Sequence, residues 1–270
     1  ILGSRVDLVS RPEAIKAINS YIIAKGNKGM NMVVTAYSEF YVQATRDAEF
    51  RSILNSSDLV VPDGVSVLGA AKYLSAVSGQ RSAVRNFVYG LRIGMDILRG
   101  KVGQSVTGVY LFEELTKLAV KEGYKVFLLG AKQGVAEKAA ARLSEKYKEL
   151  SVKFDAGEEK VGTDPNKAAE VIKKINDFKP DLLFVAYNPV KQEKWLWENK
   201  DKLKVKVGMG VGGTFDEYIG SVPKAQEFME QMGLKWLWRL ILQPSRLHRI
   251  FKAVIVFPWL VFKESLKDGV

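Results

Sequence analysis

The stretch YKVFLLGAKQGVAEKAAARLSEKYKEL, Tyr124–Leu150, contains the pattern that decides the fold. A short apolar run comes first, two glycines follow it, and then alanine and leucine recur at helical spacing. A short apolar run next to a glycine predicts a buried strand, and the periodic segment after it predicts an amphipathic helix. Strand, tight turn and helix in this order are the repeating unit of a parallel sheet.

Comparable apolar runs occur six times along the chain, and helical patterns lie between most of them, as at residues 167–178. The runs are MNMVVTA, SDLVVPDG, YKVFLLGA, LSVKFDAG, PDLLFVAYN and VKVGMGVGG. Continuous apolar strands that alternate with helices predict an α/β fold with a mostly parallel, Rossmann-like sheet and helices on both faces. Ligands of such sheets bind beyond the carboxyl ends of the strands, so the residues there are the candidates for function.

Composition excludes several kinds of site. The 270 residues include no Cys and a single His, His248, which rules out a disulfide, a thiol nucleophile and a metal site built on several histidines. The formal charge of +11 indicates an anionic partner such as nucleic acid, acidic lipid or a phosphorylated molecule. The N-terminus shows no signal peptide. The longest apolar run, Ala253–Phe262, is shorter than the roughly 20 residues that a membrane-spanning helix needs.

Two basic segments stand apart from the strand and helix pattern. In the first, at about residues 71–104, apolar residues recur at helical spacing beside a row of arginines, and Gly90 and Gly94 argue against one unbroken helix. The arginines are Arg81, Arg85, Arg92 and Arg99. The second segment, residues 233–270, is rich in Trp, Phe, Lys and Arg. We expect residues 1–232 to form an α/β domain that contains the first segment, and residues 233–270 to form a helical appendage.

Asp63 and Thr35 each have a functional and a structural interpretation. Asp63 directly follows a strand, where a partly buried carboxylate can act as a general base. Pro-Asp-Gly is also ordinary turn chemistry. Thr35, with Glu39 after it, can contact a ligand, or it can cap a helix that has Glu39 in its first turn.

Glycine-rich turns give weaker signals. Gly130 and Gly134 separate a strand from a helix, and this arrangement suits either a phosphate at the helix N-terminus or a plain tight turn. The run GMGVGGTFD lacks the G-x-G-x-x-G spacing of dinucleotide sites. A nucleotide can still approach the backbone of Gly212 and Gly213, with Asp216 beyond them.

A dense polar cluster follows the strand PDLLFVAYN. Asn188, Lys191, Gln192 and Glu193 come within six residues, just before Trp195. They can hold a polar ligand at the edge of the sheet, or they can be the solvated first turn of a helix whose Trp195 packs inward.

These stretches, taken in order, resemble the WecG/TagA/CpsF family of glycosyltransferases, which is glycosyltransferase family 26. The resemblance covers nearly the whole chain, and its order and spacing are specific. It rests on VVTAYSE, SDLVVPDG, VTGVYLFEEL, GYKVFLLGAKQGVAEKAA, PDLLFVAYNPVKQEKW, GMGVGGTFDEYIGSVPKA and GLKWLWRLILQPSRLHR. It implies the family's GT-E type of fold.

The resemblance also implies an activity and a location. The family transfers a hexose, typically N-acetylmannosamine or its uronic acid, from a UDP-sugar to a polyprenyl-diphosphate-linked sugar in cell-surface polysaccharide or teichoic acid synthesis. We expect a metal-independent enzyme without a cofactor, on the cytoplasmic side and peripheral at the inner face of the plasma membrane.

The expected partners are both substrates and an anionic membrane surface, and no nucleic acid. Because one plausible carboxylate base is at hand and no nucleophile pair is evident, we expect inversion at the anomeric carbon. Whether the chain is a monomer or a homo-oligomer is left open.

Carried over residue by residue, the resemblance implies that Asp63 is the catalytic base, with Thr35 and Gln192 beside it. Residues 1–232 would be the catalytic domain, and the appendage would associate with the membrane and complete the active site with Arg239, Arg246 and Arg249. The other expected substrate-binding residues are Glu39, Gly130, Asn188, Lys191, Glu193, Gly212, Gly213 and Asp216.

Several positions depart from the family pattern. Tyr37 stands where the family has Asn, and Ser105 and Tyr110 replace an Arg and an Asp. Two residues rather than one separate Pro189 from Gln192, and the segment at 71–104 replaces a short link.

Two other classes of protein are alternatives to a glycosyltransferase. A phosphate-ester hydrolase would need clustered metal ligands, and the sequence shows none. A non-enzymatic nucleic-acid- or membrane-binding protein would use the net charge and the basic, aromatic tail.

Overall fold

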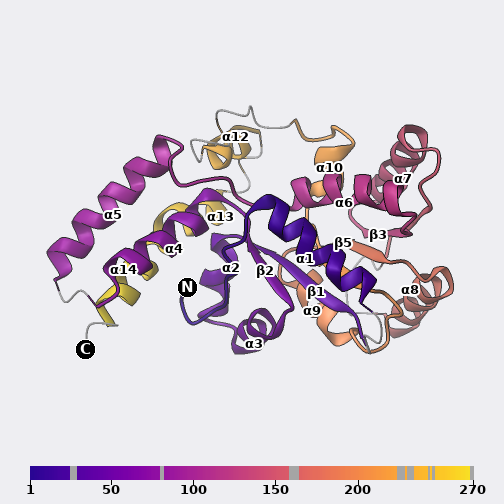
Figure 1. The fold of residues 1–270 in the computed structure, drawn as a ribbon, viewed down its shortest axis with the longest axis horizontal. Helices are drawn as coiled ribbons and strands as arrows, with labels where there is room; N and C mark the ends of the chain where they lie inside the picture. Colours follow the sequence, from indigo (N-terminus) through magenta and orange to yellow (C-terminus); the bar gives the residue numbers. More distant parts are fainter. Residues whose placement is uncertain are drawn as a thin grey trace.

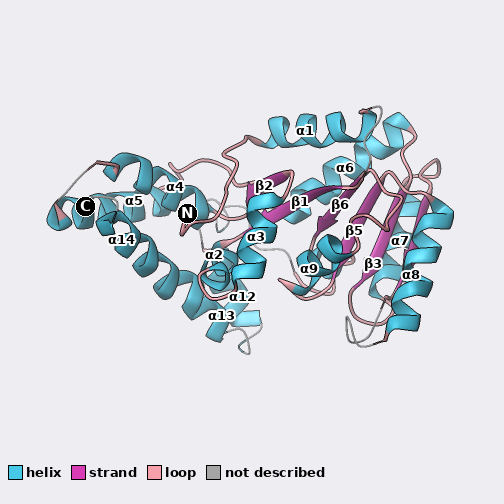
Figure 2. Ribbon diagram, turned by 90° about the horizontal axis from the view of Figure 1, so that it is seen from below, coloured by secondary structure: helices cyan, strands magenta, loops and turns pink. Residues whose placement is uncertain are grey.

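The computed structural model describes residues 1–24, 29–79, 82–157, 164–223, 229, 234–242, 244 and 247–267. Within them the chain forms a layered α/β body and a helical lobe beside it, which contains the C-terminus (Figures 1 and 2). The strands are β1 (Asn31–Ala36), β2 (Leu59–Pro62), β3 (Val126–Gly130), β4 (Val152–Asp155), β5 (Leu182–Ala186) and β6 (Val207–Gly210).

The helices fall into two groups. Those around the sheet are α1 (Arg11–Ile23), α2 (Ser38–Ala44), α3 (Ala48–Ser56), α6 (Gly108–Glu122), α7 (Val135–Lys146), α8 (Pro165–Phe178), α9 (Lys191–Glu198) and α10 (Thr214–Tyr218). The others are α4 (Val65–Val77), α5 (Ala83–Leu98), α12 (Lys235–Leu242), α13 (Leu247–Phe251), the π-helical turn η2 (Lys252–Val256) and α14 (Phe257–Lys267).

All six described strands are parallel, in the order β2-β1-β6-β5-β3-β4. Every apolar run of the sequence that predicted a strand contains one, so the predicted parallel α/β sheet is confirmed. Successive residues of β1 point to opposite faces. Val34 joins a core with α2, α3, α8, α9 and α14. Val33 joins a second core with α1, α6 and α7 on the other face. Helices therefore cover both faces, as predicted.

The first basic segment forms α4 and α5, and α5 is one helix that runs through Gly90 and Gly94. The two glycines, which weigh against one unbroken helix in the sequence, do not interrupt α5, and neither has a positive φ. Gly90 lies against the Tyr73 ring of α4, where an added Cβ would be 3.7 Å from the ring.

The C-terminal helices are joined to the first core. Phe257 and Val261 are almost completely buried and contribute to it. The longest apolar run of the sequence therefore divides, with these two side chains inward and Ile255 and Trp259 exposed. Among the described residues, no helix combines the length and the apolar character that crossing a bilayer requires.

Candidate functional site

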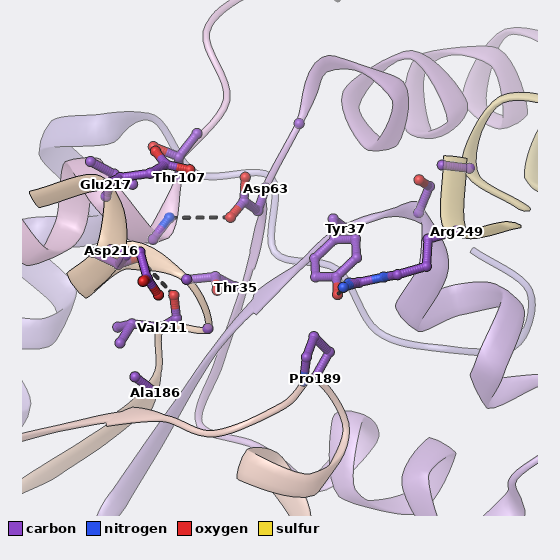
Figure 3. A pocket seen from close by; sticks show the side chains of 18 of the residues that line it. Thr35, Tyr37, Asp63, Thr107, Ala186, Pro189, Val211, Asp216, Glu217 and Arg249 are labelled. Carbon is purple, nitrogen blue, oxygen red and sulfur yellow. Dashed lines mark hydrogen bonds between the residues drawn. The ribbon is translucent and has the colours of Figure 1, made fainter. Parts of the chain in front are cut away.

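A cavity of about 1470 Å³ lies at the carboxyl ends of the strands, where the sequence predicted the site. Polar residues from the ends of five strands face one part of it, and helices α5, η2 and α14 line another part. The predicted site residues that line it are Thr35, Asp63, Asn188, Lys191, Gln192, Gly212, Gly213, Asp216 and Arg249. Figure 3 shows Thr35, Asp63, Asp216 and Arg249 around it.

Asp63 lies directly after β2 and faces the cavity (Figure 3). Its Oδ2 accepts a hydrogen bond of 3.2 Å from the backbone N–H of Gly108, the first residue of α6. Gly64 follows with φ of 115°, which L-residues rarely adopt. The Pro-Asp-Gly sequence therefore forms a turn that needs its glycine. The structural interpretation as a turn is confirmed, and the turn directs the carboxylate into the cavity. The role of general base stays a prediction.

Thr35 of β1 is buried and lies close to Gly108, the residue that also binds Asp63. Its Oγ1 donates to the carbonyl oxygen of Gly210 at 3.2 Å, which links β1 to β6 at the edge of the cavity. The N-cap residue of α2 is Tyr37, so the interpretation of Thr35 as a helix cap was wrong. An added Cβ at Gly108 would be 3.6 Å from the Thr35 hydroxyl, which shows how closely the start of α6 approaches.

The polar cluster after β5 forms a bend and the start of α9. Val190 has φ of 71°, a strained conformation for a β-branched residue. Its amide donates to Glu193 Oε2 at 2.7 Å, and the amide of Gln192 donates to the carbonyl oxygen of Asn188 at 3.1 Å. These bonds maintain the strained bend, which turns Asn188, Lys191 and Gln192 toward the cavity.

Gln192 and Glu193 are buried, so the interpretation of this turn as solvated was wrong for Glu193. Gln192 Oε1 accepts from the amide of Gly212 at 3.0 Å, and its Nε2 donates to Glu193 Oε1 at 2.6 Å. Glu193 is 0% exposed and does not line the cavity. It therefore contacts Gln192 rather than a substrate, and it positions the Gln192 amide against the loop after β6.

Burial raises the pKa of Glu193 to about 7, against an ordinary value of 4.5, although its hydrogen bonds act in the opposite direction. Between pH 4.5 and about pH 7, the Glu193 carboxyl therefore stays protonated in the folded protein, whereas it is ionised in the unfolded chain. Stability from this group is present below the lower value and is lost as the pH rises through the higher one.

We expect the free energy of unfolding of the wild type, relative to Glu193→Gln, to fall by about 2–3 kcal/mol between about pH 5 and about pH 8. The glutamine variant does not titrate at this position, so the other ionisable groups cancel in the difference. Urea unfolding of both proteins across this range measures it. A difference that does not change with pH would contradict the assignment.

Arg249 of α13 reaches the residues that follow β1. Its Nε donates to Glu39 Oε2 at 2.8 Å. One terminal nitrogen donates to the Tyr37 hydroxyl at 2.8 Å, and Figure 3 shows Arg249 beside Tyr37. Burial raises the pKa of Tyr37 far above its ordinary value, so the hydroxyl stays protonated. Glu39 does not line the cavity; it holds the arginine that does. The Tyr that departs from the family pattern thus helps to hold the appendage at the site.

Gly130 and two of the predicted arginines are not placed at the cavity by the described residues. Gly130 is not among the cavity-lining residues, and an added Cβ would be 2.7 Å from the Tyr187 ring, so close packing explains this glycine. Gly134 caps α7 with φ of 76°. The side chain of Arg239 and the whole of Arg246 lie outside the described residues, and so does Arg81 of the first basic segment.

Sequence reasoning missed several lining residues. Thr107 caps α6, and its Oγ1 accepts from the Tyr110 amide at 3.2 Å. A Thr before an apolar helical run is a cap signal that could have placed the start of α6 at the site. Ser105 lines the cavity, while Tyr110 stacks under the Arg11 guanidinium at 4.5 Å from the ring centre. Further lining residues are Ser66, Lys132, Gln133, Gly157, Thr214 and Glu217.

The fold and the site define an α/β enzyme with an open parallel sheet and one large cavity at its carboxyl edge. The sequence matches the Glycosyl transferase WecG/TagA/CpsF family over residues 1–89 and 89–269, so the chain belongs to this family. The predicted family is confirmed, and with it the prediction of a glycosyltransferase rather than a non-enzymatic binding protein.

Two relatives from Staphylococcus aureus are similar along almost their whole length. Both are named N-acetylglucosaminyldiphosphoundecaprenol N-acetyl-beta-D-mannosaminyltransferase. The protein of strain MRSA252 is 26% identical over 267 residues, which cover 99% of this chain and 93% of the relative. The protein of strain NCTC 8325 / PS 47 is 25% identical over the same coverage.

Proposed function

We propose that this chain transfers an N-acetylmannosamine-like hexose from a UDP-sugar to a polyprenyl-diphosphate-linked sugar, with inversion and without a metal ion. The names of the relatives support the sugar and the acceptor. The observation that carries the proposal is the placement of Asp63, which faces the large cavity and is oriented by the Gly108 amide. Two further carboxylates, Asp216 and Glu217, line the cavity from α10.

In the proposed reaction, Asp63 accepts the proton of the attacking acceptor hydroxyl. The acceptor oxygen bonds to the anomeric carbon while the bond from that carbon to the UDP oxygen breaks. A single displacement of this kind inverts the anomeric centre. The proton stays on Asp63 until solvent removes it, and UDP leaves with the bonding electrons.

The departing UDP carries negative charge that the protein has to offset. Arg249 supplies a guanidinium at the cavity, and guanidinium groups bind diphosphate well. Lys132 and Lys191 line the cavity as well. These side chains are the candidates for the donor diphosphate or for the lipid diphosphate of the acceptor.

The acceptor's polyprenyl chain is embedded in a bilayer, so the cavity has to reach the membrane surface. We propose that the enzyme is peripheral at the inner face of the plasma membrane and that the C-terminal helices contact the lipid. Leu247, Phe251, Ile255 and Trp259 recur at every fourth residue there, and all four are more than half exposed. Basic and aromatic residues on such a helix suit the headgroup region.

The proposed function is tested with a panel of UDP-sugars, scored by UDP release, with a short-chain polyprenyl-diphosphate-sugar as the acceptor. UDP-N-acetylmannosamine should give the fastest acceptor-dependent release, and EDTA should leave the rate unchanged. Analysis of the linkage shows whether the anomeric centre inverts. If no UDP-sugar gives acceptor-dependent release, the proposal is refuted.

A further inference from the structure

Helix α5 presents an apolar face that the described residues leave largely exposed. Six side chains at helical spacing are between 47% and 74% exposed; they are Val84, Phe87, Val88, Leu91, Met95 and Leu98. The opposite face of α5 packs tightly on α4, where an added Cβ at Gly69 would be 2.8 Å from Ile97 Cδ1. Helix α5 is therefore packed against α4 on one face, and its opposite, apolar face is exposed.

A row of cations runs along one edge of this open face. Arg85, Arg92 and Arg99 are each seven residues, or two helical turns, apart, and all three are exposed. Between Asp63 and Glu113 the sequence has one acidic residue, Asp96, against six basic ones. Apolar side chains flanked by cations are the pattern of a helix that lies at the surface of an anionic bilayer.

The N-terminal half of α5 is joined to α14 by a buried polar junction. Asn86 Nδ2 donates to the carbonyl oxygen of Ser265 at 3.2 Å and lies 3.3 Å from its hydroxyl, which is also bonded to the Tyr73 hydroxyl at 2.9 Å. Asn86 is 0% exposed. Buried polar groups of this kind fix one arrangement, so α5 and α14 hold a set orientation.

Aromatic contacts connect the open face of α5 with the exposed stripe of the C-terminal helices. Phe87 and Phe262 meet edge to face with ring centres 6.3 Å apart, and Phe262 lies 6.0 Å from the exposed Trp259. Figures 1 and 2 both show α5 beside α14, away from the sheet. The two stripes are thus parts of one surface, which we call the lobe surface.

The same helices contribute to the wall of the cavity. Gly94, Ile97 and Leu98 of α5 line it, and so do Ala253 and Val254 of η2 and Pro258 of α14. Leu98 belongs to both the lobe surface and the cavity wall. A membrane at the lobe surface would therefore lie at the apolar end of the cavity that contains Asp63.

We propose that α5 is a second membrane-docking helix, and that the lobe surface as a whole binds an anionic lipid bilayer. The inference rests on the proposed function in one respect, since a lipid-linked acceptor gives the docking its purpose. A second copy of the chain fits this surface less well, because in a symmetric contact it would add the same three arginines, whereas an anionic bilayer offers the negative charge that they lack.

The test compares two triple variants with the wild type by flotation with vesicles of phosphatidylcholine, with and without phosphatidylglycerol. Val88→Ser/Leu91→Ser/Met95→Ser removes apolar contacts from α5. The matched control, Leu8→Ser/Ile23→Ser/Phe154→Ser, changes three exposed apolar residues elsewhere. Melting temperatures verify that both variants fold.

We expect the α5 variant to lose at least about tenfold in vesicle partition, and the control to partition like the wild type. Arg85→Gln/Arg92→Gln/Arg99→Gln should lose partition only on vesicles with phosphatidylglycerol, by about fivefold for each cation removed. Transfer to a polyprenyl acceptor in vesicles should fall with partition, and transfer to a short-chain soluble acceptor should not change.

Unchanged partition of the folded α5 variant would overturn the proposal. A wild-type dimer that this variant converts to a monomer in sedimentation, with partition unaffected, would overturn it too and would assign the surface to self-association. Failure of the proposed function looks different, because then the wild type would transfer to neither acceptor while flotation still responded to the α5 variant.

Discussion

Asp63→Asn lowers kcat for hexose transfer by about 10²–10⁴-fold, which is the usual loss when a general base is removed. An amide has the size and shape of the carboxylate, and its oxygen can still accept from the Gly108 amide as Asp63 does. It cannot take a proton from the acceptor hydroxyl. Transfer is therefore lost while the fold and UDP binding remain, as single-turnover assays and calorimetric titration with UDP would show.

Asp216→Asn is the matched control, since Asp216 also lines the cavity. It makes the same chemical change on α10, where the side chain lies 3.2 Å from the Ser221 hydroxyl. A smaller loss of transfer is expected in this variant. If Asp216→Asn were the more damaging of the two, or if Asp63→Asn turned over normally, the role of base would not belong to Asp63.

Gly210→Ala destabilises the fold by about 1–3 kcal/mol, the cost of overpacking a filled interior, and impairs transfer as well. The added Cβ would be 2.5 Å from Gln192 Nε2 and closer still to Glu193 Oε1. Gly210 does not have a positive φ, so alanine meets no backbone strain there. The methyl group would displace the amide that connects the buried Glu193 to the Gly212 loop.

Gly213→Ala controls for the loss of a nearby glycine, in the loop that follows β6. Its φ is −81°, and no atom lies within 4 Å of an added Cβ. We expect urea unfolding to show little change in stability for this variant. Equal stability of both alanine variants would mean that Gln192 and Glu193 move aside at low cost and do not form a fixed network.

Much of the site could be predicted because it follows from the parallel sheet. Asp63 and Asn188 each come directly after an apolar run, and parallel strands bring all such positions to one edge. What failed was the assignment of individual roles. Glu193 was expected to contact a substrate, and its position near the start of a helix also suited a solvated side chain. The structure buries it under Gly210, a residue 17 positions further along the chain.

The sequence by itself determined the order of strands and helices, the parallel sheet, the family and the edge at which the site lies. These features depend on the spacing of apolar residues along short segments, which local backbone geometry translates directly into strands and helices. The periodicity of α5 likewise gave its apolar face and its arginine row.

Only the tertiary structure decided which side chains meet across the chain. Arg249 bonds to Glu39, which lies 210 positions away in the sequence, and Asn86 bonds to Ser265, which lies 179 positions away. No local pattern encodes such pairs, because they form only when packed helices bring distant segments together. The same packing left the face of α5 open beside the C-terminal helices, since α4 and α14 cover its other sides and the described residues leave this one largely exposed.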